Sequence, residues 1–197
     1  MGQQREASVQ RSTKETVVKV TVNLDTVTPP VIDTSIGFFN HMLEQIGKHG
    51  LLSLTVQAEG DLEVDGHHTV EDVGITLGQA FKEALGTKEG IQRYGSGAVP
   101  MDDALAQVVL DICGRPYLVL KADFPQERVG WFDTCMVKEF LQAFCTYGGI
   151  TMHVEVTGLN SHHMVEAVFK ALGRALSQAV AKDPRVSGVP STKGVLA

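Results

Sequence analysis

The pattern His-His-x-x-Glu occurs twice in the chain, and each copy opens a segment whose apolar residues recur at helical spacing. The first copy runs from His67 to Glu71, and the second runs from His162 to Glu166. Residues i and i+4 of a helix share one face, so the first histidine of each copy converges with its glutamate. Two imidazoles and a carboxylate are typical ligands of divalent metals. The pattern predicts metal binding, with the second histidine of each pair rotated toward another ion or a neighbouring subunit.

The segments around the two motifs follow one another in the same order. A predicted helix, a glycine stop, an alternating strand, a glycine turn and the motif helix occupy residues 37–85, and the same succession recurs over residues 134–180. We therefore predict an internal duplication, with halves at residues 1–95 and 96–197 that share one core. The fold class is α+β, with a mixed or antiparallel sheet in each half and helices packed on one face.

Apolar periodicity and turn residues give the bounds of the expected elements. Strands are predicted at residues 16–23, 52–58, 104–112, 117–122 and 150–156, and helices at residues 37–49, 67–85, 134–147 and 162–182. The glycine-rich residues 86–97 are predicted to form a loop. Gly50 is the expected C-cap of the first helix, and Asp133 or Thr134 the expected N-cap of the third.

Composition and charge exclude several classes of function. A chain of 197 residues with 43% hydrophobic residues predicts one domain, or two small halves around a shared core. No apolar run reaches the roughly 18 residues needed to cross a bilayer, and residues 1–14 lack the apolar core of a signal peptide. A net charge of −6 argues against nucleic acid as a partner. The three cysteines have no regular spacing, lie in apolar surroundings and are expected in the core of a cytoplasmic protein.

Further candidate residues lie outside the two motifs. His41 and Glu139 occupy corresponding places in the predicted repeat, and both residue types ligate divalent metals, although His41 alone could equally be a structural histidine. Basic residues beside small residues, or on the last helix, form a second set: Arg93, Arg115, Lys170 and Lys193. Each of these could be a solvated charge. Together they could instead bind a phosphate, which arginine holds through two parallel hydrogen bonds.

These residues and their neighbours resemble the imidazoleglycerol-phosphate dehydratase family over residues 11–196. The motifs that carry the resemblance are Arg11-x-Thr13-Lys14-Glu15-Thr16, Phe39-Asn40-His41-Met42-Leu43, His67-His68-Thr69-Val70-Glu71-Asp72, Arg93-Tyr94-Gly95, Met101-Asp102-Asp103-Ala104-Leu105-Ala106, Gly114-Arg115-Pro116-Tyr117, His162-His163-Met164-Val165-Glu166-Ala167-Val168-Phe169-Lys170-Ala171-Leu172 and Ser191-Thr192-Lys193-Gly194. Many ordered motifs of this length make the resemblance specific.

The resemblance implies a histidine-biosynthesis enzyme that dehydrates imidazole glycerol phosphate to imidazole acetol phosphate. It implies a homo-oligomer, a 24-mer, with two Mn²⁺ ions per active site and sites formed between subunits. The metal ligands that it implies are His41, His67, His68, Glu71, Glu139, His162, His163 and Glu166. Many family members carry a histidine where this chain has Glu139, and a carboxylate is an acceptable substitute as a metal ligand. Cys113, where serine is usual, is expected to change only packing.

The resemblance also assigns roles in catalysis. Glu15 resembles the acid/base carboxylate of the family, and the metal-holding His41, Glu71 and Glu166 are the other expected catalytic residues. Substrate contacts are implied for Glu15, Gln45, His49, Arg93, Arg115, Lys170, Ser191, Thr192 and Lys193. The implied reaction passes through a metal-bound imidazolate, which expels the hydroxyl to give a diazafulvene-like intermediate. A base then removes the carbon-bound proton, and the enol becomes the ketone.

Two other functions also fit the metal-binding pattern. A metal-storage or metal-assembled structural protein would use the same histidines and glutamates, but it would not need Arg93, Arg115 or Lys193. A two-metal phosphoesterase would need both the metals and the cations, and it would release inorganic phosphate. Ketone formation from imidazole glycerol phosphate and Mn²⁺ distinguishes the dehydratase from both.

Overall fold

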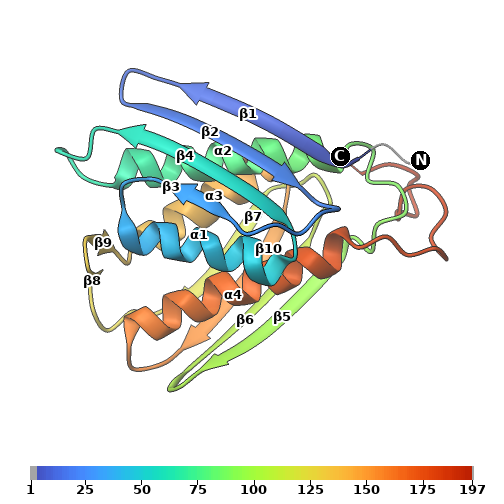
Figure 1. Cartoon of the computed structure of the whole chain (residues 1–197). Coiled ribbons are helices and arrows are strands. Elements are labelled where there is room, and N and C mark those ends of the chain that lie inside the picture. The colour runs from blue at the N-terminus through green and yellow to red at the C-terminus, as the bar shows by residue number, and fades with distance from the viewer. Residues whose placement is uncertain (1–3, 197) are drawn as a thin grey trace.

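Four helices lie between two four-stranded sheets in the computed structural model, which describes residues 4–196 (Figure 1). The outermost ends of the two predicted halves, residues 1–3 and residue 197, lie outside the described residues. The helices therefore form a middle layer, and each sheet has one face on this layer.

The first half of the chain builds one sheet and two helices. Its elements are β1 (Glu6–Ser12), β2 (Thr16–Asn23), β3 (Val31–Asp33), α1 (Gly37–Gly50), β4 (Ser53–Gly60) and α2 (His67–Leu85). The strand order is β1-β2-β4-β3, in which β1, β2 and β4 are antiparallel and β3 runs parallel to β4. The predicted alternation in β2 is confirmed, because Val18, Val20 and Val22 are fully buried under α2.

The second half repeats this plan. Its elements are β5 (Tyr94–Met101), β6 (Ala104–Asp111), β7 (Tyr117–Ala122), β8 (Arg128–Val129), β9 (Phe132–Asp133), α3 (Met136–Gly148), β10 (Thr151–Thr157) and α4 (Ser161–Val180). The strand order β5-β6-β10-β7 has the same two antiparallel pairs and one parallel pair. The predicted α+β class with duplicated half-domains is confirmed. The second set of elements begins with β5, so the predicted division after residue 95 falls inside a strand.

The helices pair across the two halves, α1 with α4 and α2 with α3. Both crossings depend on glycine. A Cβ atom at Gly173 of α4 would lie 2.9 Å from the backbone nitrogen of Gly50 in α1. A Cβ atom at Gly78 of α2 would lie 2.9 Å from the backbone nitrogen of Gly148 in α3. The two crossings are thus equivalent, and each brings the last residue of one helix against the middle of the other.

Some expectations for the strands and for the first helix were wrong. β1 and β3 were not predicted, and the last four residues of the expected 86–97 loop belong to β5. Gly95 is in this strand because α4 lies directly over it, since a Cβ atom there would lie 1.9 Å from the carbonyl oxygen of Ala175. Leu51, with a φ of 52°, adopts the left-handed conformation after α1. Gly50 is instead the last helical residue and contacts α4.

The start of α3 also differs from expectation. Neither Asp133 nor Thr134 caps the helix, which begins after Cys135 without a side-chain cap. The Thr134 hydroxyl donates instead to the carbonyl oxygens of Gln126 and Glu127. Cys135 is exposed rather than part of the core, whereas the other two cysteines are buried as predicted.

The inner faces of the sheets and the four helices share one hydrophobic core. Aromatic side chains join the two halves within it: Phe140 of α3 stacks on Phe169 of α4 at 5.3 Å between ring centroids, and its edge meets Phe39 of α1 at 5.5 Å. None of the helices within residues 4–196 is both long enough and apolar enough to cross a membrane.

Candidate active site

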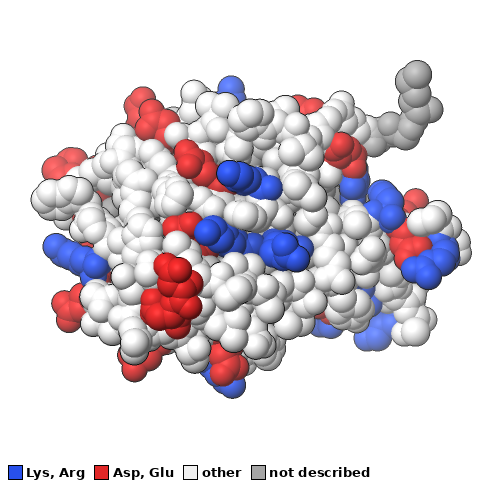
Figure 2. All heavy atoms as spheres, turned by 60° about the horizontal axis from the view of Figure 1, so that its bottom comes forward, with Lys and Arg blue, Asp and Glu red and all other residues white. Residues whose placement is uncertain are grey.

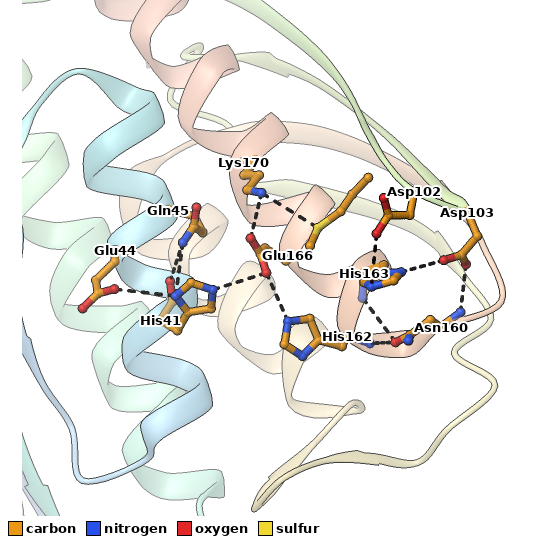
Figure 3. A network of polar contacts seen from close by, with 11 residues as sticks. His41, Glu44, Gln45, Asp102, Asp103, Asn160, His162, His163, Glu166 and Lys170 are labelled. Carbon is orange, nitrogen blue, oxygen red and sulfur yellow. Dashed lines mark hydrogen bonds and ion pairs between the residues drawn. The ribbon is translucent and has the colours of Figure 1, made fainter.

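The paired helices α1 and α4 bring together three of the predicted metal ligands (Figure 3). The Nε2 atoms of His41 and His162 each lie 3.2 Å from Oε2 of Glu166. One ligand atom from each of the three residues lies within 4.8 Å of the others. Two imidazoles and a carboxylate at this spacing fit one divalent cation. The chain therefore contains a donor set suited to the metal that the sequence predicts.

Glu166 divides its two oxygens between different partners. One faces the two imidazoles, and the other accepts a hydrogen bond from Nζ of Lys170 at 2.7 Å. The side chain is nearly buried, and burial alone would raise its pKa. The hydrogen bond and charge of Lys170, together with His41, outweigh this effect and hold the pKa of Glu166 below its usual value. Glu166 is therefore charged at neutral pH, as a metal-binding carboxylate must be.

The face of α1 toward this cluster carries further polar groups. Gln45 follows His41 at i+4, its amide nitrogen lies 3.3 Å from Nδ1 of His41, and it donates to the His41 carbonyl at 3.2 Å. His49 follows one turn later. Burial lowers the pKa of His49, and the positive charges of Lys170, Lys48 and other neighbours lower it further. His49 is therefore neutral at pH 7 and can both donate and accept hydrogen bonds.

The first motif, at the start of α2, forms a more open group. Nε2 of His67 lies 3.9 Å from Oε2 of Glu71. Nδ1 of His68 lies 3.1 Å from both carboxylate oxygens of Asp61 and 3.9 Å from Oε2 of Glu15. The hydrogen bond to Asp61 raises the pKa of His68. The structure thus places the predicted acid/base Glu15 beside a predicted metal ligand.

The second histidine of the second motif has a similar partner. Nδ1 of His163 lies 2.6 Å from Asp103, and its Nε2 lies 3.6 Å from Asp102. Asp103 also accepts the backbone N–H groups of Leu159 and Asn160 at 2.5 and 3.0 Å. The hydrogen bond from His163, followed by these backbone bonds, lowers the pKa of Asp103 to about 2. Asn160 caps α4 through its side-chain oxygen.

Asp61 and Asp103 are functional candidates that the sequence analysis missed. A carboxylate only accepts hydrogen bonds, so Nδ1 of each histidine donates and Nε2 is left available for a metal. Asp103 lies in a motif that carries the family resemblance, and this was the available signal. Its partner could not be named, because the two residues lie 60 positions apart and meet only through the packing of the β5–β6 turn on α4.

Most of the predicted phosphate-binding residues lie elsewhere. Arg93 donates to both carboxylate oxygens of Asp111 at 2.7 and 3.0 Å, and to the Pro190 carbonyl at 2.9 Å. This last hydrogen bond holds the C-terminal segment near Arg93, and Ser191, Thr192 and Lys193 directly follow Pro190 in that segment. Arg115, just after the end of β6, is exposed. These residues form what we call the cationic end.

The cationic end and the His41 cluster lie at opposite ends of α4. His162 opens this helix, whereas the Arg93 backbone donates to the Ala179 carbonyl near its other end. At about 1.5 Å per residue, the two positions are roughly 25 Å apart along the helix. Figure 1 shows α4 running from the side of β8 and β9 to the side of the chain termini. Within residues 4–196, Lys170 is the only predicted phosphate contact that bonds to the His41 cluster.

Positively charged side chains are grouped on one face of the molecule (Figure 2). On the face shown in Figure 2, Lys and Arg side chains gather near the centre, with Asp and Glu side chains along one side. Basic groups from α1 and α4 act together on His49, namely Lys48, Lys170 and Arg174. Although the chain is acidic in total, these basic groups form a local region of positive charge, which favours an anionic ligand.

Glu139, like His67, His68, Glu71 and His163, is a predicted ligand outside the three-donor group of the described residues. Among the described residues, His41, His162 and Glu166 form the one group of three donor side chains within ligand distance. Glu139 is half-buried and lines a cleft between α3 and β7. Because α3 crosses α2 as α1 crosses α4, it occupies the position on α3 that His41 occupies on α1. Its role as a ligand stays a prediction.

Comparison with known proteins places this geometry in a family. The family model for imidazoleglycerol-phosphate dehydratase matches residues 34–176. Relatives of that name are 54% identical in Cereibacter sphaeroides, with 98% of this chain and 100% of the relative covered, and 56% identical in Rhodopseudomonas palustris, with 98% of each covered. A solved dehydratase structure from Staphylococcus aureus is 40% identical with a TM-score of 0.82, covering 90% of this chain and 99% of its own. One from Pyrococcus furiosus is 35% identical with the same TM-score, covering 95% and 100%. Sequence and fold agree, and the chain belongs to the imidazoleglycerol-phosphate dehydratase family of histidine-biosynthesis enzymes.

Proposed function

We propose that this dehydratase converts imidazole glycerol phosphate into imidazole acetol phosphate and water with the help of two Mn²⁺ ions per active site. The observation that carries the proposal is the convergence of His41, His162 and Glu166 between α1 and α4. The residues that would hold the metals are His41, His67, His68, Glu71, Glu139, His162, His163 and Glu166. Bound cations would act as Lewis acids toward the substrate imidazole and would fix its orientation. Imidazole and carboxylate ligands suit Mn²⁺.

Glu15 is the proposed acid/base. Its side chain is 56% exposed, and within residues 4–196 its carboxylate has no hydrogen bond, only the 3.9 Å approach to His68. A carboxylate that is not engaged elsewhere can accept the carbon-bound proton of the substrate and return a proton during tautomerisation. We propose that the substrate hydroxyl leaves before this proton, through a diazafulvene-like form of the substrate.

The remaining predicted contacts divide into two groups. Gln45, His49 and Lys170 lie on the two helices of the His41 cluster, where they would orient the substrate. The cationic end would hold its phosphate through Arg93, Arg115, Ser191, Thr192 and Lys193. Since roughly 25 Å of α4 separates His162, in the His41 cluster, from the cationic end, a small substrate cannot contact both the metal ligands of that cluster and the cationic end in one chain. We therefore propose a homo-oligomer, a 24-mer by family resemblance, in which active sites form between subunits.

We propose that the protein works in the cytoplasm. All three cysteines are free thiols, which fits the reducing cytoplasm. The net charge of −6 makes nucleic acid an unsuitable partner, and the proposed partners are the phosphorylated substrate and further copies of the chain.

The decisive experiment uses metal-stripped protein, imidazole glycerol phosphate and added Mn²⁺, with the ketone product as the signal. We expect activity only after Mn²⁺ is added, and loss of both activity and bound metal in Glu166→Gln. Glu155→Gln, on the exposed face of β10, is the matched control and should keep both. Full activity without metal would contradict the proposal. Release of inorganic phosphate in place of ketone would favour the phosphoesterase.

A second experiment tests the acid/base. We expect Glu15→Gln to lower kcat by about 10²–10⁴-fold, while metal content and thermal stability stay unchanged. Because Glu15 is an exposed turn residue, a fold defect is not expected. A fully active Glu15→Gln enzyme would assign the proton transfer to another group.

A further inference from the structure

Asp72 directly follows the first His-His-x-x-Glu motif, but its contacts are with the sheet. The residue is only 7% exposed. One carboxylate oxygen accepts from Nε of Arg11 at 2.8 Å, and the other accepts from the hydroxyl of Thr16. Asp72 therefore joins α2 to the last residue but one of β1 and to the first residue of β2. It lies one helical turn after His68, on the same face of α2.

The backbone between these two strands is the turn that carries Glu15. The Thr13 hydroxyl accepts the N–H groups of Glu15 and Thr16 at 3.1 and 2.9 Å. The Thr13 N–H donates to the Thr16 carbonyl at 2.9 Å, and the Glu15 carbonyl accepts from the Asp61 N–H at 3.1 Å. The Asp72 carboxylate fixes the two ends of this turn against α2. The backbone of Glu15 is thereby held, while its carboxylate stays free.

The second half of the chain lacks this arrangement. The β5–β6 turn corresponds to the β1–β2 turn, and α4 corresponds to α2. Ala167 stands one turn after His163, where α2 has Asp72 one turn after His68. Asp103, the turn carboxylate on this side, is occupied by His163 and two backbone N–H groups. The buried Asp72 thus occurs in the half whose turn carboxylate, that of Glu15, accepts no hydrogen bond within the described residues.

We propose that Asp72 is a positioning residue that acts through Glu15. Together with Arg11 and Thr16 it holds the β1–β2 turn so that the Glu15 carboxylate stays at the start of α2, beside His68. The inference rests on the proposed role of Glu15 as the acid/base. It assigns no metal ligand and no substrate contact to Asp72.

Two substitutions remove the contact from opposite sides. Asp72→Asn keeps the size of the side chain but loses its charge, and Thr16→Val keeps the shape of Thr16 but loses its hydroxyl. In both variants we expect kcat to fall by about 10- to 100-fold, with KM and bound Mn²⁺ close to wild type. Thr16→Ser restores the hydroxyl and should restore kcat. Asp25→Asn, which breaks the Arg5–Asp25 ion pair at the other end of β1 and β2, is the control and should leave kcat unchanged.

A double-substitution cycle shows whether the effect passes through Glu15. In a Glu15→Gln background, Asp72→Asn and Thr16→Val should cause no additional loss of kcat. A further loss there, or an unchanged kcat in both single variants, would overturn the inference while leaving Glu15 as the acid/base. A fully active Glu15→Gln enzyme would overturn both proposals. If Asp72→Asn does not fold, the comparison of Thr16→Val with Thr16→Ser still decides the question.

Discussion

Arg93 and Arg115 are both proposed to hold phosphate, but their guanidinium groups have different surroundings. The Arg93 guanidinium donates hydrogen bonds to Asp111 and to the Pro190 carbonyl. The hydrogen bonds to Asp111 raise the pKa of Arg93 above its ordinary value. Arg115 is exposed, and no hydrogen bond or ion pair of its guanidinium occurs within residues 4–196. Arg93 therefore supports the structure of the cationic end, whereas Arg115 is free to bind a ligand.

This difference gives a prediction for the two alanine variants. Arg115→Ala should weaken substrate binding by about 1.5–3 kcal/mol, the value of a charged hydrogen bond, and leave the melting temperature unchanged. Arg93→Ala should raise KM and also lower the melting temperature, because it releases Asp111 and the tail. Steady-state kinetics and thermal unfolding measure the two effects. An unchanged KM in both variants would refute a phosphate site at the cationic end.

Glu139 is the residue at which chain and family differ. If its carboxylate is a ligand, Glu139→Ala should lose one metal per subunit, or bind it far more weakly, while circular dichroism stays native. The added negative charge should also favour Mn²⁺ over Zn²⁺ relative to relatives with histidine there. Gln142→Ala, on the same cleft, is the control. Two metals bound at wild-type affinity in Glu139→Ala would show that water or substrate fills the position.

Sequence predicts contacts at this scale when they repeat a helical period. His162 and Glu166 are four residues apart, so their 3.2 Å contact follows from helix geometry. The contact of His41 with Glu166 spans 125 positions and needed both the repeat and the family. The hydrogen bond between Asp72 and Thr16 could not be predicted, because it depends on how α2 lies over the β1–β2 turn.

Among the elements, all four helices were predicted within three residues at either end, and the strands less completely. The helices have wide apolar stripes and glycine stops, which single sequences show well. β1 alternates half-buried and exposed residues and has no fully buried side chain, so its period is weak. β5 contains Gly95 and Gly97, which usually signal a loop. Here they are needed because the α4 backbone approaches the strand too closely for a Cβ atom.

The glycine crossings give a prediction for the elements. A Cβ atom at Gly173 would lie 2.9 Å from the Gly50 nitrogen and 3.1 Å from the Ile46 carbonyl oxygen, so α1 and α4 must separate. We expect Gly173→Ala to lower the free energy of unfolding by about 1–3 kcal/mol. It should also weaken metal binding, because His41 is on one helix and Glu166 on the other.

The control for this substitution is Gly37→Ala at the start of α1, where an added Cβ atom meets nothing within 4 Å. Denaturant unfolding and metal titration are the measurements. A Gly173→Ala protein with wild-type stability would mean that the crossing tolerates a wider spacing. Reduced stability with unchanged metal affinity would mean that the crossing does not set the ligand geometry.

For the whole molecule, the distance between the His41 cluster and the cationic end gives a prediction about mixed assemblies. Arg115→Ala and His162→Ala subunits are combined, stripped of metal and reassembled with Mn²⁺, and activity is measured at a substrate concentration below KM, where each variant alone has low activity. Random mixing should restore up to about a quarter of the sites, because each restored site takes its histidine from one subunit type and its arginine from the other.

Two controls accompany the mixing experiment. The double variant with both substitutions in one chain, mixed with either single variant, should regain no activity. Light scattering before and after chelation shows whether subunits exchange. Exchange without any regained activity would place both residue sets of a working site in the same chain.

The length of α4 has one more consequence, which concerns dilution. A catalyst whose site lies within one chain keeps its specific activity at any protein concentration. When one chain provides the imidazoles and another the phosphate-binding groups, the concentration of working sites falls faster than the total concentration once assemblies dissociate. At low protein concentration, the reaction velocity would then rise with an apparent order above one in protein concentration. At concentrations where all subunits are assembled, the order would return to one. Because α4 separates the His41 cluster from the cationic end, the specific activity of the enzyme would thus depend on its own concentration.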